Sequence, residues 1–119
     1  MRVLVWAGVA VLGGCGALLR FALDGAVSER VRVSEFPWGT FAVNLSGAFL
    51  LGLLAGLALH GDALLLAGTA TLGSYTTFST WMLEAHRLGE DGSLGLAFLN
   101  VALSIVAGVG AAELGRLIG

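Results

Sequence analysis

Four long runs without a charged residue dominate this sequence and restrict what it can fold into. They cover residues 3–19, 39–59, 63–83 and 92–112, and the first continues past Arg20 to Leu23. An α-helix needs about 20 apolar residues to cross the hydrocarbon core of a bilayer. The sequence therefore predicts an all-α membrane protein, residues 1–119 forming one membrane domain with spans at about 3–23, 39–59, 63–85 and 92–114.

The composition argues against several classes of function. Only 12% of the residues are charged and the net charge is −2, so we expect no nucleic-acid partner. The chain has one cysteine and two histidines at predicted span ends, and it lacks a nucleophile-elbow motif, so we expect no enzyme. Charged side chains punctuate residues 24–38, which we expect to form a polar connection ahead of the second span.

The arginines favour no single orientation strongly. An even number of spans places both termini on one side, with Arg2 and Arg116, and the other side holds the remaining four: Arg20, Arg30, Arg32 and Arg87. Positive residues favour the cytoplasmic side, and this bias is weak. Two topologies stay open: a single one with the first and third connections cytoplasmic, and a dual one in which copies insert both ways and pair antiparallel.

Polar and small residues line one face of the second and fourth spans. Asn44 is followed by Ala48, Gly52 and Gly56 at intervals of four, a stripe that lets another helix approach closely. The fourth span repeats this spacing with three residues of its own: Asn100, Ser104 and Gly108. Such side chains either form hydrogen bonds between helices or face a water-filled pathway.

Hydroxyl side chains crowd the centre of the third span, residues 68–81. Gly, Ser and Thr disfavour a continuous helix, and the sequence predicts a break near Gly73–Thr76. Backbone carbonyls freed within a membrane need a partner, and a cation is one such partner. Phe78 and Trp81 lie three residues apart on one face, where their ring edges either pack or meet an anion.

Three stretches of the chain resemble the signature stretches of the Fluc fluoride channels, also called CrcB proteins. The stretches are residues 13–21 (GGCGALLRF), 39–49 (GTFAVNLSGAF) and 73–81 (GSYTTFSTW), and they match in order, spacing and span. The resemblance implies a dual-topology antiparallel dimer in the cell membrane of a prokaryote, with two fluoride pores and a structural sodium ion at the dimer interface.

The resemblance also implies roles for individual residues in the pore. Asn44 matches the pore asparagine, Phe78 the first of two pore phenylalanines, and Ser104 the serine of a polar track. Trp81 replaces the second phenylalanine, and Asn100 stands where another polar or tyrosine side chain is frequent. The remaining expected pore residues are hydroxyl-bearing ones beside Phe78: Thr77 and Thr80.

Three further assignments follow from the same resemblance. Gly73 and Thr76 match the positions whose backbone carbonyls hold the sodium ion. Arg20 matches a vestibule arginine, whose charge would raise the local anion concentration at a pore mouth. Glu84 matches a family glutamate near the end of the third span.

The residues leave other functions open. Trp81 and the missing hydroxyl at Gly108 are compatible with one subunit of a two-protein fluoride channel. A small multidrug-resistance-type exporter has four helices and needs a membrane-embedded carboxylate, for which Glu84 is the only candidate. A structural or regulatory membrane subunit is the third alternative. The expected role is passive export of cytoplasmic fluoride, which confers fluoride resistance.

The weak arginine bias generates a topology prediction. A single cysteine placed in the first connection, in a chain whose Cys15 has been replaced, should react with an impermeant maleimide in about half of the copies in intact cells. Reaction of all copies, or of none, would show a single orientation. The same cysteine labelled after permeabilisation gives the total.

Overall fold

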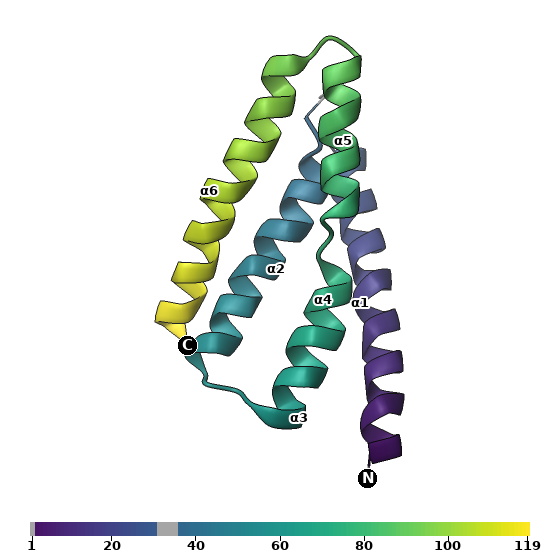
Figure 1. Ribbon diagram of the computed structural model, residues 1–119, viewed down its shortest axis with the longest axis vertical. Coiled ribbons are helices and arrows are strands. Elements are labelled where there is room, and N and C mark those ends of the chain that lie inside the picture. The colour runs from purple at the N-terminus through teal and green to yellow at the C-terminus, as the bar shows by residue number, and fades with distance from the viewer. Residues whose placement is uncertain (1, 31–35) are drawn as a thin grey trace.

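The computed structural model describes residues 2–30 and 36–119, which form four helical rods side by side (Figure 1). They are α1 (Arg2–Arg30), α2 (Trp38–Gly56), an interrupted third rod, and α6 (Leu94–Ile118). The molecule measures 52 × 29 × 22 Å, so its long axis exceeds the roughly 30 Å of a bilayer's hydrocarbon core. The predicted all-α architecture of four rods is confirmed.

Three helices of the described chain, α1, α2 and α6, are long and apolar enough to cross a membrane. Large apolar side chains on the outside of α1 and α6 are largely exposed, among them Val3, Phe21 and Val106. A soluble protein would bury these side chains, whereas lipid solvates them. The chain is thus a multi-pass membrane protein, and its third rod differs from the other three because it is divided.

The third rod consists of four helical pieces, in chain order α3 (Gly61–Leu64), the π-helix η1 (Leu65–Leu72), α4 (Gly73–Tyr75) and α5 (Ser79–Glu90). Thr76 is extended, with φ −80° and ψ 161°, and the helix resumes at Ser79. The predicted break is confirmed, but it begins later than expected, since Gly73–Tyr75 is still helical. The wide turns of η1 precede the break, and the hydroxyl of Thr71 donates to the carbonyl of Leu66, five residues back, at 2.7 Å.

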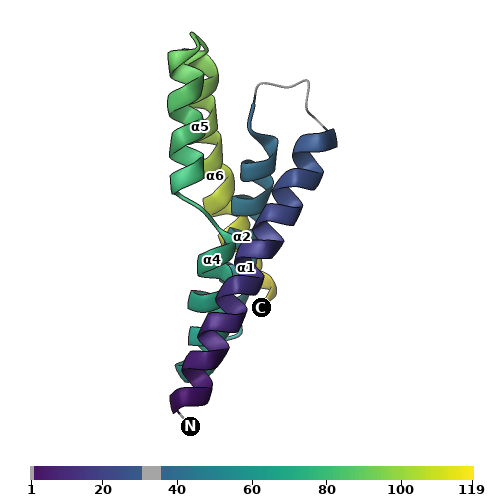
Figure 2. The same ribbon diagram turned by 90° about the vertical axis from the view of Figure 1, so that its right-hand side faces the viewer.

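The break sends the two halves of the third rod to different neighbours. In the first half, η1 and α4 pack against α1, whereas α5 leans away and packs against α6 (Figures 1 and 2). α2 lies between these partners and contacts every other rod. A continuous helix could not follow both α1 and α6, so the break sets the shape of the bundle.

The prediction that residues 24–38 form a polar connection is wrong for residues 24–30. These residues continue α1 as a helix, and the hydroxyl of Ser28 donates to the carboxylate of Asp24 at 3.2 Å. No proline stops the helix there, and Gly39 of α2 has no Cβ, which would overlap the side chain of Asp24. Residues 31–35 lie outside the described part of the chain.

Glycines bring α2 and α6 into close contact. A Cβ at Gly52 would overlap the carbonyl oxygen of Ala112, and one at Gly56 would overlap that of Arg116. Gly115 of α6 meets the carbonyl of Phe49 in the same way. The helix that the small-residue stripe of α2 admits is therefore α6 of the same chain.

This contact generates a stability prediction with a matched control. Gly52→Ala should lower the free energy of unfolding by about 1–3 kcal/mol, because α2 and α6 must separate to accommodate the methyl group. Gly110→Ala on α6 meets nothing within 4 Å and should be neutral or slightly stabilising. Thermal unfolding of the purified protein in detergent measures both. Equal melting temperatures for the two variants would contradict the close approach.

Candidate ion-conduction site

Asn44 on α2 holds the peptide groups at the break. Its amide nitrogen donates to the carbonyl of Thr77 at 2.8 Å, and its amide oxygen accepts from the backbone N–H of Thr77, also at 2.8 Å. One side chain thus replaces both hydrogen bonds that a continuous helix would have given this residue. An amide nitrogen carries two hydrogens, so one remains for another acceptor.

The break withdraws helical hydrogen-bond donors from the carbonyls on its upstream side, among them those of Gly73 and Thr76. In a continuous helix, the N–H of Thr77 would donate to the carbonyl of Gly73, and the N–H of Thr80 to that of Thr76. Here the first donates to Asn44 at 2.8 Å and the second to the hydroxyl of Thr77 at 3.2 Å. The carbonyls of Gly73 and Thr76 are the two that the resemblance to the Fluc family implies as sodium ligands.

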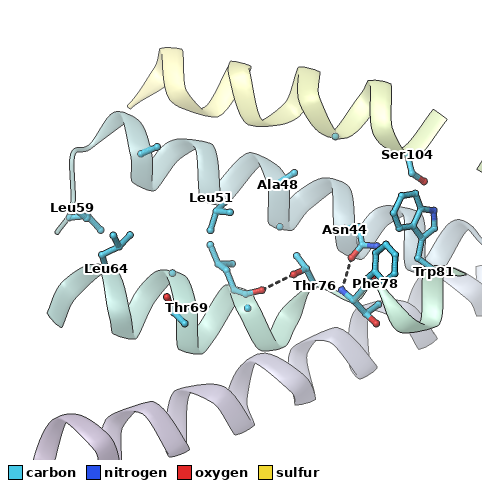
Figure 3. Close-up of a pocket in the computed structure, with 17 residues that line it drawn as sticks. Asn44, Ala48, Leu51, Leu59, Leu64, Thr69, Thr76, Phe78, Trp81 and Ser104 are labelled. Carbon is cyan, nitrogen blue, oxygen red and sulfur yellow. Dashed lines mark hydrogen bonds between the residues drawn. The ribbon is translucent and has the colours of Figure 1, made fainter. Parts of the chain in front are cut away.

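A cavity of about 870 Å³ lies beside the break, between α2, the third rod and α6 (Figure 3). Leucines and small residues line its end near Leu59 and Leu64, and polar and aromatic residues line the other end. The structure brings the following residues from the sequence prediction together at its wall: Asn44, Gly73, Thr76, Thr77, Phe78, Trp81, Ser104 and Gly108.

Phe78 and Trp81 form an edge-to-face pair in this wall. Their ring centroids are 5.7 Å apart and their planes meet at 82°, so the edge of one ring points at the face of the other. Phe78 is the more accessible of the two, with 70% of its surface exposed. An exposed ring beside polar groups is available to an ion or to another protein surface.

Two predicted residues lie in a second, smaller cavity. Arg20 and Thr80 line a space of about 160 Å³ together with Asp24 and Thr40. Thr77 borders both cavities, so the break separates a large apolar-walled space from a small charged one. Sequence reasoning placed Arg20 at a pore mouth but missed Asp24 and Thr40, although a threonine within an apolar run was a visible signal.

Two N–H donors near the larger cavity are buried without an acceptor. Asn100 is completely buried and does not line the cavity, but its side-chain oxygen accepts from Ser104 at 3.5 Å. Within residues 2–30 and 36–119, neither the amide nitrogen of Asn100 nor the indole nitrogen of Trp81 has a hydrogen-bond partner. Unpaired buried donors cost about 1–3 kcal/mol each, and they favour an electron-rich ligand.

Fold and site together define a class of protein: a small multi-pass membrane protein whose polar side chains gather at a broken helix. The family model described as CrcB-like protein, Camphor Resistance (CrcB), matches residues 7–116. The chain belongs to this CrcB family. Membership sets aside the alternative of a small multidrug-resistance-type exporter.

Curated relatives cover nearly the whole chain. "Fluoride-specific ion channel FluC 2" of Mycolicibacterium paratuberculosis (strain ATCC BAA-968 / K-10) is 58% identical over 114 residues, covering 96% of this chain and 93% of the relative. The protein of the same name from Mycobacterium tuberculosis H37Rv is 53% identical, covering 99% and 93%. "Fluoride-specific ion channel FluC 1" of Symbiobacterium thermophilum is 41% identical, covering 96% of both.

The two hydrogen bonds by which Asn44 clamps the backbone of Thr77 generate a prediction for backbone hydrogen exchange. Asn44→Ala removes the acceptor of the Thr77 N–H, and loss of one such bond, about 1.4 kcal/mol, should speed exchange of this amide about tenfold. The N–H of Thr76 donates to the carbonyl of Leu72, the last residue of η1, at 3.0 Å and should keep its protection. Residue-resolved exchange by mass spectrometry compares the two amides in one sample. Equal protection of Thr77 in both proteins would refute the clamp.

Proposed function

We propose that this chain forms a fluoride-specific ion channel, a passive transporter rather than an enzyme. The observation that carries the proposal is the identity of 53–58% over nearly the full length to proteins named fluoride-specific ion channels. The geometry supports it because donors and ring edges meet at the larger cavity. The channel would let fluoride leave the cytoplasm down its electrochemical gradient.

Fluoride holds its water tightly, so a pore must offer replacement donors. On this proposal, the second amide hydrogen of Asn44 and the hydroxyl of Thr77 donate to the ion at the cavity wall, and Ser104 does so by turning its proton away from Asn100. The unpaired indole N–H belongs to Trp81 at the cavity wall, and the unpaired amide N–H belongs to Asn100, whose oxygen accepts from Ser104. A dehydrated anion would restore the hydrogen bonds that these donors lack.

The aromatic pair supplies weaker contacts. The edge of a phenyl ring is slightly positive and offers an anion no strong bond. Phe78 would therefore pass fluoride without trapping it, and conduction needs binding weak enough to release. Trp81 adds an indole N–H at a position where the family usually has a second phenylalanine.

Arg20 and Thr80 would act at a pore mouth. The guanidinium raises the local concentration of anions, while Asp24 in the same cavity limits the effect of its charge. Thr80 and Thr77 carry hydroxyls at the point where the two cavities approach each other.

A second copy of the chain, antiparallel to the first, is the proposed partner. The larger cavity and the exposed ring of Phe78 lie on the surface of one copy, where a partner would cover them. The weak arginine bias permits insertion in both orientations. The alternative partner is a paralogous subunit, which the departures at Trp81 and Gly108 would accommodate.

The antiparallel dimer provides a place for a structural sodium ion. The carbonyls of Gly73 and Thr76 have lost their helical donors, and neutral backbone oxygens suit a hard monovalent cation. Two copies related by a two-fold axis would bring four such carbonyls together. The ion would neutralise the carbonyl dipoles and hold the two breaks against each other.

Flux from liposomes tests the function. Vesicles carrying the purified chain are loaded with fluoride or chloride, and a potassium ionophore clamps the potential while electrodes record efflux. We expect rapid fluoride efflux and chloride efflux at the level of empty vesicles. Similar rates for both ions would contradict the selectivity. Silence with fluoride, followed by activity on adding a paralogous chain, would establish the two-protein channel instead.

A pair of phenylalanines provides a matched control for the ring-edge contact. Phe78→Ile should lower fluoride efflux at least tenfold, about 1.4 kcal/mol in the barrier, because isoleucine keeps the bulk but lacks a ring edge. Phe98→Ile on α6 removes an equally exposed ring outside the cavity and should leave efflux unchanged. Trp81→Phe should keep or raise the rate. Efflux that survives Phe78→Ile and fails with Trp81→Phe would contradict the account.

A further inference from the structure

Tyr75 is the last helical residue before the break, and it is buried with its hydroxyl. Its relative exposure is 9%, and it packs in the core with Val43 and Leu72. A buried tyrosine needs a partner for its O–H, since an unpaired hydroxyl in an apolar core is costly. The partner is Ser46 of α2, whose hydroxyl oxygen lies 2.7 Å from that of Tyr75.

The direction of this hydrogen bond follows from the single proton on each hydroxyl. Ser46 donates its proton to the carbonyl of Val43 at 3.1 Å. It therefore accepts from Tyr75, and a chain of two hydrogen bonds runs from Tyr75 through Ser46 to the backbone of α2.

Two other residues of α2 contact the residues that follow Tyr75. A Cβ at Gly47 would overlap the methyl group of Thr76, so Gly47 admits Thr76 against the helix. Asn44 holds the peptide groups of Thr77. Three residues in one turn of α2 thus contact three consecutive residues of the third rod, each by a different interaction.

We propose that Tyr75 and Ser46 are positioning residues for the break, holding its upstream end as Asn44 holds its downstream end. Neither lines the larger cavity, so neither touches the ion. They act through Thr76 and through the ring of Phe78, which both line it. If the end of α4 rotates, the Thr76 carbonyl and the Phe78 ring no longer keep their positions in the wall of the larger cavity. This inference rests on the proposed function for its transport readout.

Four variants test the pair. Tyr75→Phe and Ser46→Ala each remove the hydrogen bond between the two side chains. The double variant has no further bond of this pair to lose, and Ser46→Thr keeps a hydroxyl at position 46. Ser28→Ala on the exposed end of α1 is the control for loss of a hydroxyl. In sparsely reconstituted liposomes, the fraction of vesicles that empty counts working channels, and the rate constant reports the rate through each channel.

We expect each single variant to lower the fluoride rate constant at least threefold while the fraction of vesicles that empty stays constant. The double variant should be no slower than the slower single one, and Ser46→Thr should recover the rate. A lower fraction with an unchanged rate constant would mean that the pair only stabilises the fold. Losses that multiply in the double variant would mean that the two hydroxyls act separately. Either result overturns the proposal.

Hydrogen exchange separates this proposal from that of fluoride transport. Tyr75→Phe should speed exchange of the Thr76 and Thr77 amides at least threefold, whichever ion the protein conducts, and the amides of α6 should not change. If wild-type vesicles release no fluoride, the proposed function fails and this measurement still decides the role of Tyr75. Unchanged exchange at both amides would overturn it.

Discussion

Every backbone N–H and C=O group inside a bilayer needs a partner from the protein, because no water is there to replace one. The rest of this structure depends on how α2 meets that need at Thr76–Phe78. Asn44 pairs both peptide groups of Thr77, and the hydroxyl of Thr77 takes the N–H of Thr80. Without these side chains the third rod would have to continue as a helix, and the cavity wall would lose its polar end.

The break and the glycines of α2 together determine which helices meet. Because the third rod bends at Thr76, its first half packs on α1 and its second half on α6. Gly52 and Gly56 hold α6 close to α2, and this brings Ser104 to the same cavity as Asn44. One interruption in hydrogen bonding therefore accounts for the bundle's shape and for the gathering of polar groups from three rods.

Much of this could be predicted from residue patterns, because hydrophobic runs and helix-breaking residues report on local structure. The four rods and the break follow from them, and so do several residues at the polar end of the larger cavity. The patterns did not predict the π-helix η1. Its wider turns change which side of the rod later residues face, and the chain stays helical until Tyr75, beyond Gly73. Residue patterns also could not show that Asn44 donates one of its amide hydrogens to the carbonyl of Thr77. Nor could they show that Arg20 and Thr80 line the smaller cavity and not the larger one.

The unpaired donors of Trp81 and Asn100 bear on which ions the proposed pore selects. Water can donate as well as accept, so a site lined by acceptors would suit water and cations equally. The two buried N–H groups can only donate, and they gain nothing from a cation. Of the two residues, Trp81 lines the larger cavity, so on the proposed function its indole N–H is a group that would bind an anion and not a cation. The proposed pore thus favours a small anion over a cation, while the ring edge of Phe78 keeps the ion from being held too tightly to leave.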